Sequence, residues 1–143
     1  MDNNNNSQLS TLNSQLSSDS QLKQNVVKTK SFDFALRMIK LSKYLQNEKR
    51  EFVISKQVLR SGTSVGALVR ESEHAQSKAD FIHKMSIALK EANETDYWIE
   101  LLHKSEEITD EAYNSLQPQI QELIKLLVKI VKTSKERNVK HVK

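Results

Sequence analysis

The chain has 143 residues, of which 37% are hydrophobic and 28% are charged, a balance that fits one globular domain better than two. With only 2 glycines and 1 proline, it lacks the turn residues that a many-stranded β-sandwich or barrel needs, and an all-α fold is favoured. The absence of cysteine excludes disulfides, thiolate metal sites, iron–sulfur clusters and cysteine nucleophiles, and it fits a reducing compartment.

The net charge of +4 is concentrated at one end of the chain. From Lys125 to Lys143 there are seven basic residues and one acid, whereas the first 124 residues carry a small net negative charge. Such a segment either solvates the chain end or makes a salt-sensitive contact with nucleic acid or another anion.

No apolar run approaches the roughly 20 residues of a membrane span, and the first six residues lack the features of a secretory signal. We therefore expect a cytoplasmic protein without membrane contact.

Residues 1–30 form a segment rich in Asn, Gln and Ser, with six, four and six of these residues. It has too few apolar side chains to offset the entropy lost on ordering, so the composition predicts a disordered tail. Leu9, Leu12 and Leu16 lie at helical spacing, and a transient or partner-bound helix is the alternative.

Beyond the tail, apolar residues recur at helical spacing in four segments. The first begins at Ser31, its predicted N-cap, and ends near Asn47. The second runs from about residue 55 to 75. The third follows Ser77, which forms a capping box with Asp80, and the fourth begins at Thr109. The predicted core positions are Phe34, Met38, Leu41, Leu45, Val58, Ser61, Val65, Leu68, Ser72, Phe81, Met85, Ala88, Ala92, Thr95, Ile99, Leu102, Tyr113, Leu116, Ile120, Leu123, Leu127 and Ile130.

Short connections at 48–54, 75–77 and 105–108 make consecutive helices antiparallel neighbours. The sequence therefore predicts an up-down-up-down antiparallel four-helix bundle over residues 31–134, followed by a basic tail at 135–143. Pro118 cannot donate a backbone hydrogen bond, and we expect a kink or a fresh helix start near it.

The two glycines, Gly62 and Gly66, lie four residues apart inside the second predicted helix, where each costs about 0.8–1 kcal/mol relative to alanine. Close approach of a neighbouring backbone would offset this cost. The alternative is an anion-binding turn around Arg60, but the chain contains no Gly-x-x-x-x-Gly-Lys loop. We assign both glycines to helix packing.

Two Glu-x-x-His pairs, Glu71 with His74 and Glu100 with His103, have the spacing that di-iron bundles use. Both lie near the C-terminal ends of neighbouring antiparallel helices, which places them roughly 30 to 40 Å apart and unable to share one metal pair. No Gly-x-Ser-x-Gly turn presents a nucleophile. We expect no metal, no cofactor and no catalytic residue, and a metal-dependent bundle enzyme is kept as a third alternative.

The fourth predicted helix carries two surfaces for contacts outside the bundle. Its lysines recur at spacings of 4 and 3 on the side opposite the core stripe. A second apolar line on the same helix exceeds what one bundle seam requires and predicts burial against another subunit. Tyr97 and Trp98 are adjacent in sequence and must point in different directions, so one of them meets a partner or a wet rim. We assign Trp98 to the predicted interface. The predicted oligomer interface comprises Ile124, Val128, Val131 and Trp98.

The stretch from Ser55 to Ala67, SKQVLRSGTSVGA, resembles the four-helix bundle family encoded by intervening sequences of large-subunit ribosomal RNA genes. The motifs AQSKADFIHK at 75–84, ALKEA at 88–92 and ETDYW at 94–98 extend the resemblance to about residues 32–133. Leu68 departs from the family pattern, which has Asn after Gly-Ala.

The same family includes the accessory variability proteins of diversity-generating retroelements, which form ring-shaped homopentamers and bind RNA and a reverse transcriptase. The resemblance implies a homopentameric bundle with a nucleic-acid role and no catalytic residues. We predict a non-enzymatic oligomer that binds RNA, DNA or a ribonucleoprotein partner such as a reverse transcriptase. The alternative is a protein-interaction scaffold without nucleic-acid contact. The basic residues assigned to nucleic acid are Arg60, Arg70, Lys78, Lys125, Lys129, Lys132, Lys135 and Arg137.

Overall fold

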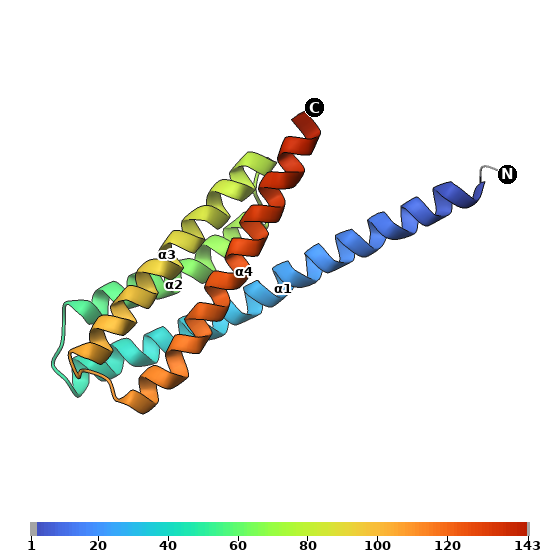
Figure 1. Cartoon of the computed structure of the whole chain (residues 1–143). Coiled ribbons are helices and arrows are strands. Elements are labelled where there is room, and N and C mark those ends of the chain that lie inside the picture. Colours follow the sequence, from blue (N-terminus) through green and yellow to red (C-terminus); the bar gives the residue numbers. More distant parts are fainter. Residues whose placement is uncertain (1–2, 143) are drawn as a thin grey trace.

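The computed structural model describes the backbone of residues 3–142 and the side chains of residues 18–137. It contains four helices, α1 (Asn3–Asn47), α2 (Ile54–Ser72), α3 (Lys78–Lys104) and α4 (Asp110–Val142), and no strand within residues 3–142. α1 contacts α2 and α4, and α3 contacts the same two helices (Figure 1). The predicted all-α four-helix bundle is confirmed. Along the described part of the chain, no helix combines the length and apolarity needed to span a bilayer.

The core that helical spacing predicts is confirmed at nearly every position. Leu68, Phe81 and Tyr113 are half-buried at its margin, and Ser61, Ser72 and Thr95 are its buried polar members. Each helix therefore contributes one stripe to a single interior. The buried apolar residues are Val27, Phe34, Met38, Leu41, Leu45, Val58, Val65, Val69, Met85, Ala88, Ala92, Ile99, Leu102, Ile108, Leu116, Ile120, Leu123, Leu127, Ile130 and Val131.

The start of α1 differs from the prediction, because the helix begins at Asn3 rather than at Ser31. Ser31 lies inside α1, where its hydroxyl donates to the carbonyl of Lys28 at 3.1 Å, so its assignment as an N-cap is wrong. Residues 18–30, assigned to a disordered tail, are helical, and Val27 is fully buried. This contact extends the core stripe one turn beyond the predicted boundary. The side chains of Leu9, Leu12 and Leu16 lie outside the described residues.

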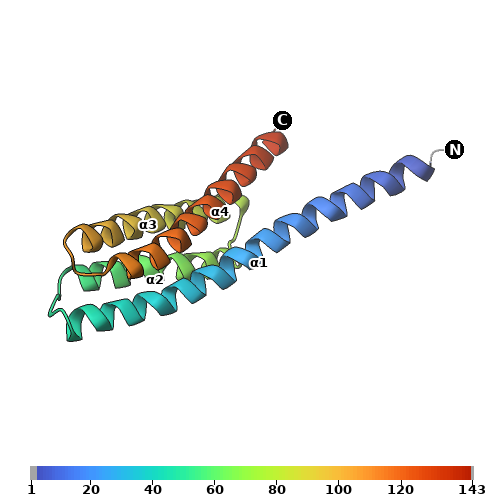
Figure 2. The same cartoon turned by 60° about the horizontal axis from the view of Figure 1, so that its bottom comes forward.

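Figures 1 and 2 show that the N-terminal half of α1 extends beyond the other three helices and diverges from α4. α4 is also longer than predicted, because the residues assigned to a basic tail continue it to Val142.

Pro118 lies within α4, so the expected fresh start near this residue is wrong. Pro118 falls nine positions into a long helix, which tolerates the one missing hydrogen bond.

Side-chain caps fix the starts of the other helices. The hydroxyl of Ser77 accepts from the backbone N–H of Asp80 at 3.0 Å, which confirms Ser77 as the cap. The carboxylate of Asp80 reaches back as predicted, but it accepts from the N–H of Gln76 and not from that of Ser77. The hydroxyl of Thr109 accepts from the N–H of Ala112 at the start of α4. These contacts satisfy N–H groups that have no partner inside the helix.

The cap of α2 comes from Glu51, which the sequence analysis did not single out. Its carboxylate accepts from the N–H groups of Val53, Ile54 and Ser55 at 3.0, 2.9 and 2.7 Å. Burial by itself raises the pKa of Glu51, but these three backbone hydrogen bonds outweigh it and hold the pKa below the ordinary 4.5. The ionised carboxylate therefore stabilises the start of α2.

Both glycines pack against α1, as predicted. A Cβ at Gly62 would overlap the side chain of Met38, with its sulfur only 2.9 Å away. A Cβ at Gly66 would lie 3.2 Å from the carbonyl oxygen of Ser31, which is a backbone atom. The two helices therefore approach closely along this pair, and at Gly66 only a backbone shift could make room.

Replacing Gly66 with leucine is expected to lower the free energy of unfolding by about 1–3 kcal/mol, because the added side chain forces α1 away from α2. The same substitution at Ala79, which is exposed in the first turn of α3, is the control and leaves stability nearly unchanged. Urea denaturation followed by circular dichroism measures both. Equal stability of the two variants would contradict the close approach.

Replacing Glu51 with alanine is expected to cost about 1 kcal/mol at neutral pH, the typical value of a helix cap. Because the folded pKa lies below 4.5, the stabilisation is complete above that value and is lost as the pH falls through the folded pKa. The difference from wild type therefore shrinks as the pH falls below 4.5 and vanishes once the Glu51 carboxylate is protonated in the folded state. Glu48→Ala, at an exposed neighbouring acid, is the control, and identical losses for both variants at pH 7 would refute the cap.

Candidate nucleic-acid interface

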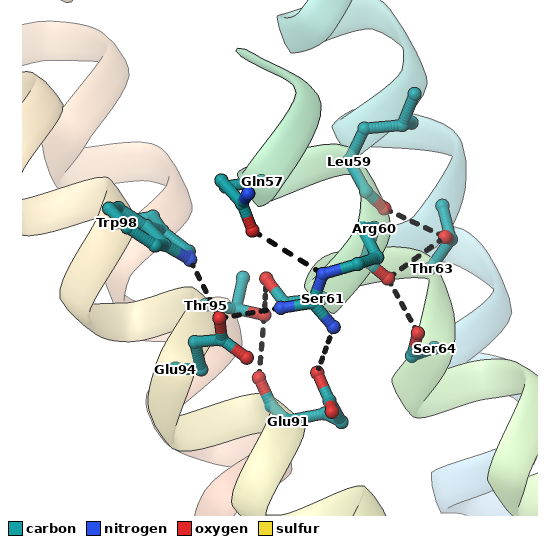
Figure 3. Close-up of polar contacts among 10 residues, drawn as sticks. All are labelled: Gln57, Leu59, Arg60, Ser61, Thr63, Ser64, Glu91, Glu94, Thr95 and Trp98. Carbon is teal, nitrogen blue, oxygen red and sulfur yellow. Dashed lines mark hydrogen bonds and ion pairs between the residues drawn. The ribbon is translucent and has the colours of Figure 1, made fainter. Parts of the chain in front are cut away.

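Arg60 lies between two glutamates of the neighbouring helix (Figure 3). Its guanidinium pairs with Glu91 at 3.1 Å and with Glu94 at 2.5 Å, and Glu94 also accepts from the indole N–H of Trp98 at 3.2 Å. Directly beneath, the hydroxyl of Thr95 donates to Ser61 at 2.8 Å in the buried seam between α2 and α3. The cluster fixes the register of these two helices.

The electrostatics follow from this geometry. The hydrogen bond to Glu94 raises the pKa of Arg60, and the hydrogen bond from Arg60 lowers the pKa of Glu94. The single positive charge of Arg60 thus faces two negative charges. The structure therefore places this predicted nucleic-acid residue in an intramolecular ion-pair cluster, where it is not available as a free cation for phosphate.

The other two cations predicted outside α4 are exposed and occupy different surroundings. Arg70 on α2 stacks its guanidinium over the ring of Phe32 on α1, 5.6 Å from the centroid. Lys78, at the start of α3, lines a cleft of about 290 Å³ together with Arg137 of α4. The structure thus brings two predicted residues, 59 positions apart in sequence, to the same end of the bundle.

The predicted cations of α4 all face solvent. None of them forms an ion pair with a carboxylate within residues 18–137. Two exposed acids accompany these cations on the same stretch of α4: Glu122, which is paired with Lys30 of α1, and Glu136. The exposed cations are Lys125, Lys129, Lys132, Lys135 and Arg137.

A second cleft, of about 220 Å³, lies where α1 and α4 begin to diverge. Lys129 and Arg137 line it from α4, and Lys23 and Asp19 line it from α1. Lys23 was missed by the sequence analysis because it falls in the segment assigned to a disordered tail. The α4 cations, Lys23 and Lys78 together define what we call the basic end of the bundle.

The predicted oligomer interface is largely used within one chain. Val131 is buried in the bundle core, which corrects its assignment to a contact between copies. Ile124 and Trp98 are half-buried against the same core. Val128 is 44% exposed and is the predicted interface residue that faces outward most clearly. The second apolar line of α4 is explained mainly by packing inside the bundle.

The two Glu-x-x-His pairs remain separate. His103 contacts the carboxylate of Asp110 at 2.6 Å and stacks on Tyr113 with ring centroids 4.0 Å apart. Glu71 and His74 are exposed near the end of α2. Within residues 18–137, no group of three or more His, Asp or Glu side chains could hold a metal ion.

Comparison with known proteins defines the class of this bundle. Residues 23–129 match the family described as 23S rRNA-intervening sequence protein, and the chain belongs to that family. It is similar to a crystal structure of a protein of unknown function from the S23 ribosomal protein family of Bacteroides thetaiotaomicron VPI-5482. The identity is 60% over 77% of this chain and 98% of that chain, with a TM-score of 0.75. No curated protein matches the chain.

The Arg60 cluster predicts a structural role that solution experiments can separate from nucleic-acid binding. Replacing Arg60 with glutamine is expected to cost about 1 kcal/mol of stability and to raise the pKa of Glu94, because two carboxylates lose their partner. A pH titration of the fluorescence of Trp98, the only tryptophan, reports this shift. Lys56→Gln, an exposed substitution on the same helix, is the control. Weaker RNA binding with an unchanged Glu94 titration would reverse the assignment.

Proposed function

We propose that this chain is a non-enzymatic, cytoplasmic RNA-binding protein whose contact surface is the basic end of the bundle. The observation that carries the proposal is the row of exposed lysines along α4, which have no carboxylate partner within residues 18–137. Two cations on the wall of the bundle differ from these lysines, because Arg60 is held by two acids and Lys28 by Glu73 at 3.0 Å.

The spacing of the α4 cations suits a phosphate backbone. Lys125, Lys129 and Lys132 follow one face of a helix over about two turns, a span of roughly 10 Å at 1.5 Å per residue. Lysine contacts of this kind bind phosphate without reading base sequence. The proposed partner is therefore RNA bound mainly through its backbone.

The proposal includes assembly into a homopentameric ring of up-down-up-down bundles, on the family resemblance. Several copies of a weak phosphate site on one ring would raise the overall affinity through effective concentration. The exposed apolar side chains of α1 support contact with other protein surfaces, and they leave a scaffold without nucleic acid as the second candidate function.

Changing Lys129, Lys132 and Lys135 to glutamine is expected to weaken RNA binding and to flatten its salt dependence. Each phosphate neutralised on a single strand contributes a slope of about −0.7 in log affinity against log salt. Loss of three contacts therefore flattens the slope by about two units. The fold should persist, since all three side chains face solvent. Filter binding of a single-stranded RNA across a salt series measures the slope.

The matched control changes Lys40, Lys43 and Lys49 to glutamine, removing the same charge from exposed residues near the other end of α1. If both triple variants weaken binding equally, net charge rather than the α4 surface is responsible. Absence of RNA binding by the wild-type protein at about 0.15 M salt would favour the scaffold function.

A further inference from the structure

Three large apolar side chains lie on the exposed side of α1, among charged residues that include Asp33 and Lys40. Phe32, Leu36 and Ile39 are 50%, 46% and 39% exposed, and they follow each other at spacings of 4 and 3 on the side opposite the core residue Met38. Isolated exposed apolar residues are ordinary on a protein surface, but three in a row on one helix face mark a contact site. We call these three residues the outer face of α1.

A groove of about 470 Å³ borders this face, between α1 and α2. Its floor is made of small residues, Ala35 from α1 and Thr63, Gly66 and Ala67 from α2, and Phe32 lies at its edge. The groove exists because small side chains occupy α2 where it passes α1. A large side chain from outside would find apolar walls here.

Four polar side chains also line the groove: Lys28, Arg70, Glu71 and His74. Lys28 is paired with Glu73, so Arg70 supplies the positive charge that has no acid partner among the side chains that the structure describes. Its guanidinium lies over Phe32 and forms no ion pair with a carboxylate within residues 18–137. A planar guanidinium held in this way presents hydrogen-bond donors to an incoming carboxylate. The groove therefore suits an aromatic or aliphatic anchor accompanied by an acid.

The same chain carries such a combination on α3. Tyr97 is 55% exposed and rests edge-on against Trp98, with ring centroids 5.2 Å apart. Glu100, three residues further along the helix, is exposed and has no basic partner among the described side chains. An anchor and an acid at i and i+3 project from one helix face.

These two patches lie on opposite sides of the molecule. α1 and α3 each contact α2 and α4 but not each other, so they occupy diagonal corners of the bundle. Tyr97 cannot reach the groove of its own chain. Two different, complementary patches on opposite sides generate head-to-tail association, which closes into a ring when the rotation between copies allows.

We propose that the α1–α2 groove of one copy receives the partner's Tyr97, with Arg70 facing the partner's Glu100. The occupant of the groove is a second copy of this chain. The inference deepens the oligomer part of the proposed function and rests on it, but it places the contact on α1 and α3 instead of α4.

The first test compares three substitutions that each add one positive charge at an exposed position. Leu36→Lys places a charge on the outer face of α1 beside the groove, and Tyr97→Lys removes the anchor. Val128→Lys alters the α4 surface and is the matched control. Light scattering is expected to show that the wild type and Val128→Lys are oligomers. The other two variants are expected to be monomers, with association weakened about tenfold or more. Circular dichroism shows that all three remain folded.

The second test mixes the two monomeric variants. Leu36→Lys retains its Tyr97, and Tyr97→Lys retains its groove, so one productive contact forms and the mixture gives a dimer that cannot grow. Pairing of two α1 faces with each other would leave the mixture monomeric. In a charge-reversal series, Arg70→Glu and Glu100→Arg are each expected to weaken association, and the double variant is expected to restore it.

The proposal is overturned if the wild type is a monomer at micromolar concentration, if Val128→Lys dissociates while Leu36→Lys does not, or if the mixture gives no dimer. Failure of this proposal can be distinguished from failure of the proposed RNA binding, because the two are measured with different variants. A monomeric Leu36→Lys protein retains the α4 lysines and their salt-dependent contact with RNA, whereas the lysine-to-glutamine variant of α4 remains an oligomer.

Discussion

The close approach of α1 and α2 at the two glycines is the constraint on which the bundle depends. Gly66 leaves only 3.2 Å between a hypothetical Cβ and the Ser31 carbonyl, so α1 has a defined rotation and height relative to α2. That rotation directs Met38 into the core and leaves Phe32 and Leu36 outside. The groove beside α1 follows from the same small residues, so core packing and the proposed contact surface have one origin.

The sides of the bundle, which we call its walls, differ from its basic end in how their cations are paired with acids. On the walls, two cations hold helices together: Arg60 pairs with two acids of α3, and Lys28 pairs with Glu73 at the end of α2. Arg70 has no acid partner among the described side chains and lies over Phe32. At the basic end, α4 continues beyond its buried residues Ile130 and Val131, and its cations form no ion pair with an acid within residues 18–137. Asp19 of α1 lines the same cleft as Lys129 and Arg137. Exposed pairs contribute modestly to stability, whereas unpaired cations set the long-range field that a polyanion meets.

Helical spacing predicted the core and three of the four helix starts, because periodicity and caps such as Ser77 are local in sequence. The predicted start of α1 was wrong, because the many Asn, Gln and Ser residues of this segment indicated disorder despite the helical spacing of Leu9, Leu12 and Leu16. Val27 is buried only by contact with other helices, which the local sequence does not show. The cap from Glu51 was missed because it requires the chain to turn through Arg50, whose φ is 54°. The pairing of Arg60 with acids 31 and 34 residues away cannot be read from spacing within one helix.

The length of α1 has a mechanical consequence. The helix runs from Asn3 to Asn47 without glycine or proline, a distance of roughly 68 Å at 1.5 Å per residue, and only its C-terminal part is clamped by α2 and α4. A long, continuous helix that is packed against its neighbours at one end only can transmit a force from its free end to its packed end. Force applied to its free half reaches the clamped half as torque, and the clamped half carries both the packing at Gly66 and the apolar outer face. Tension or docking at the arm is thereby transmitted to the seam between α1 and α2.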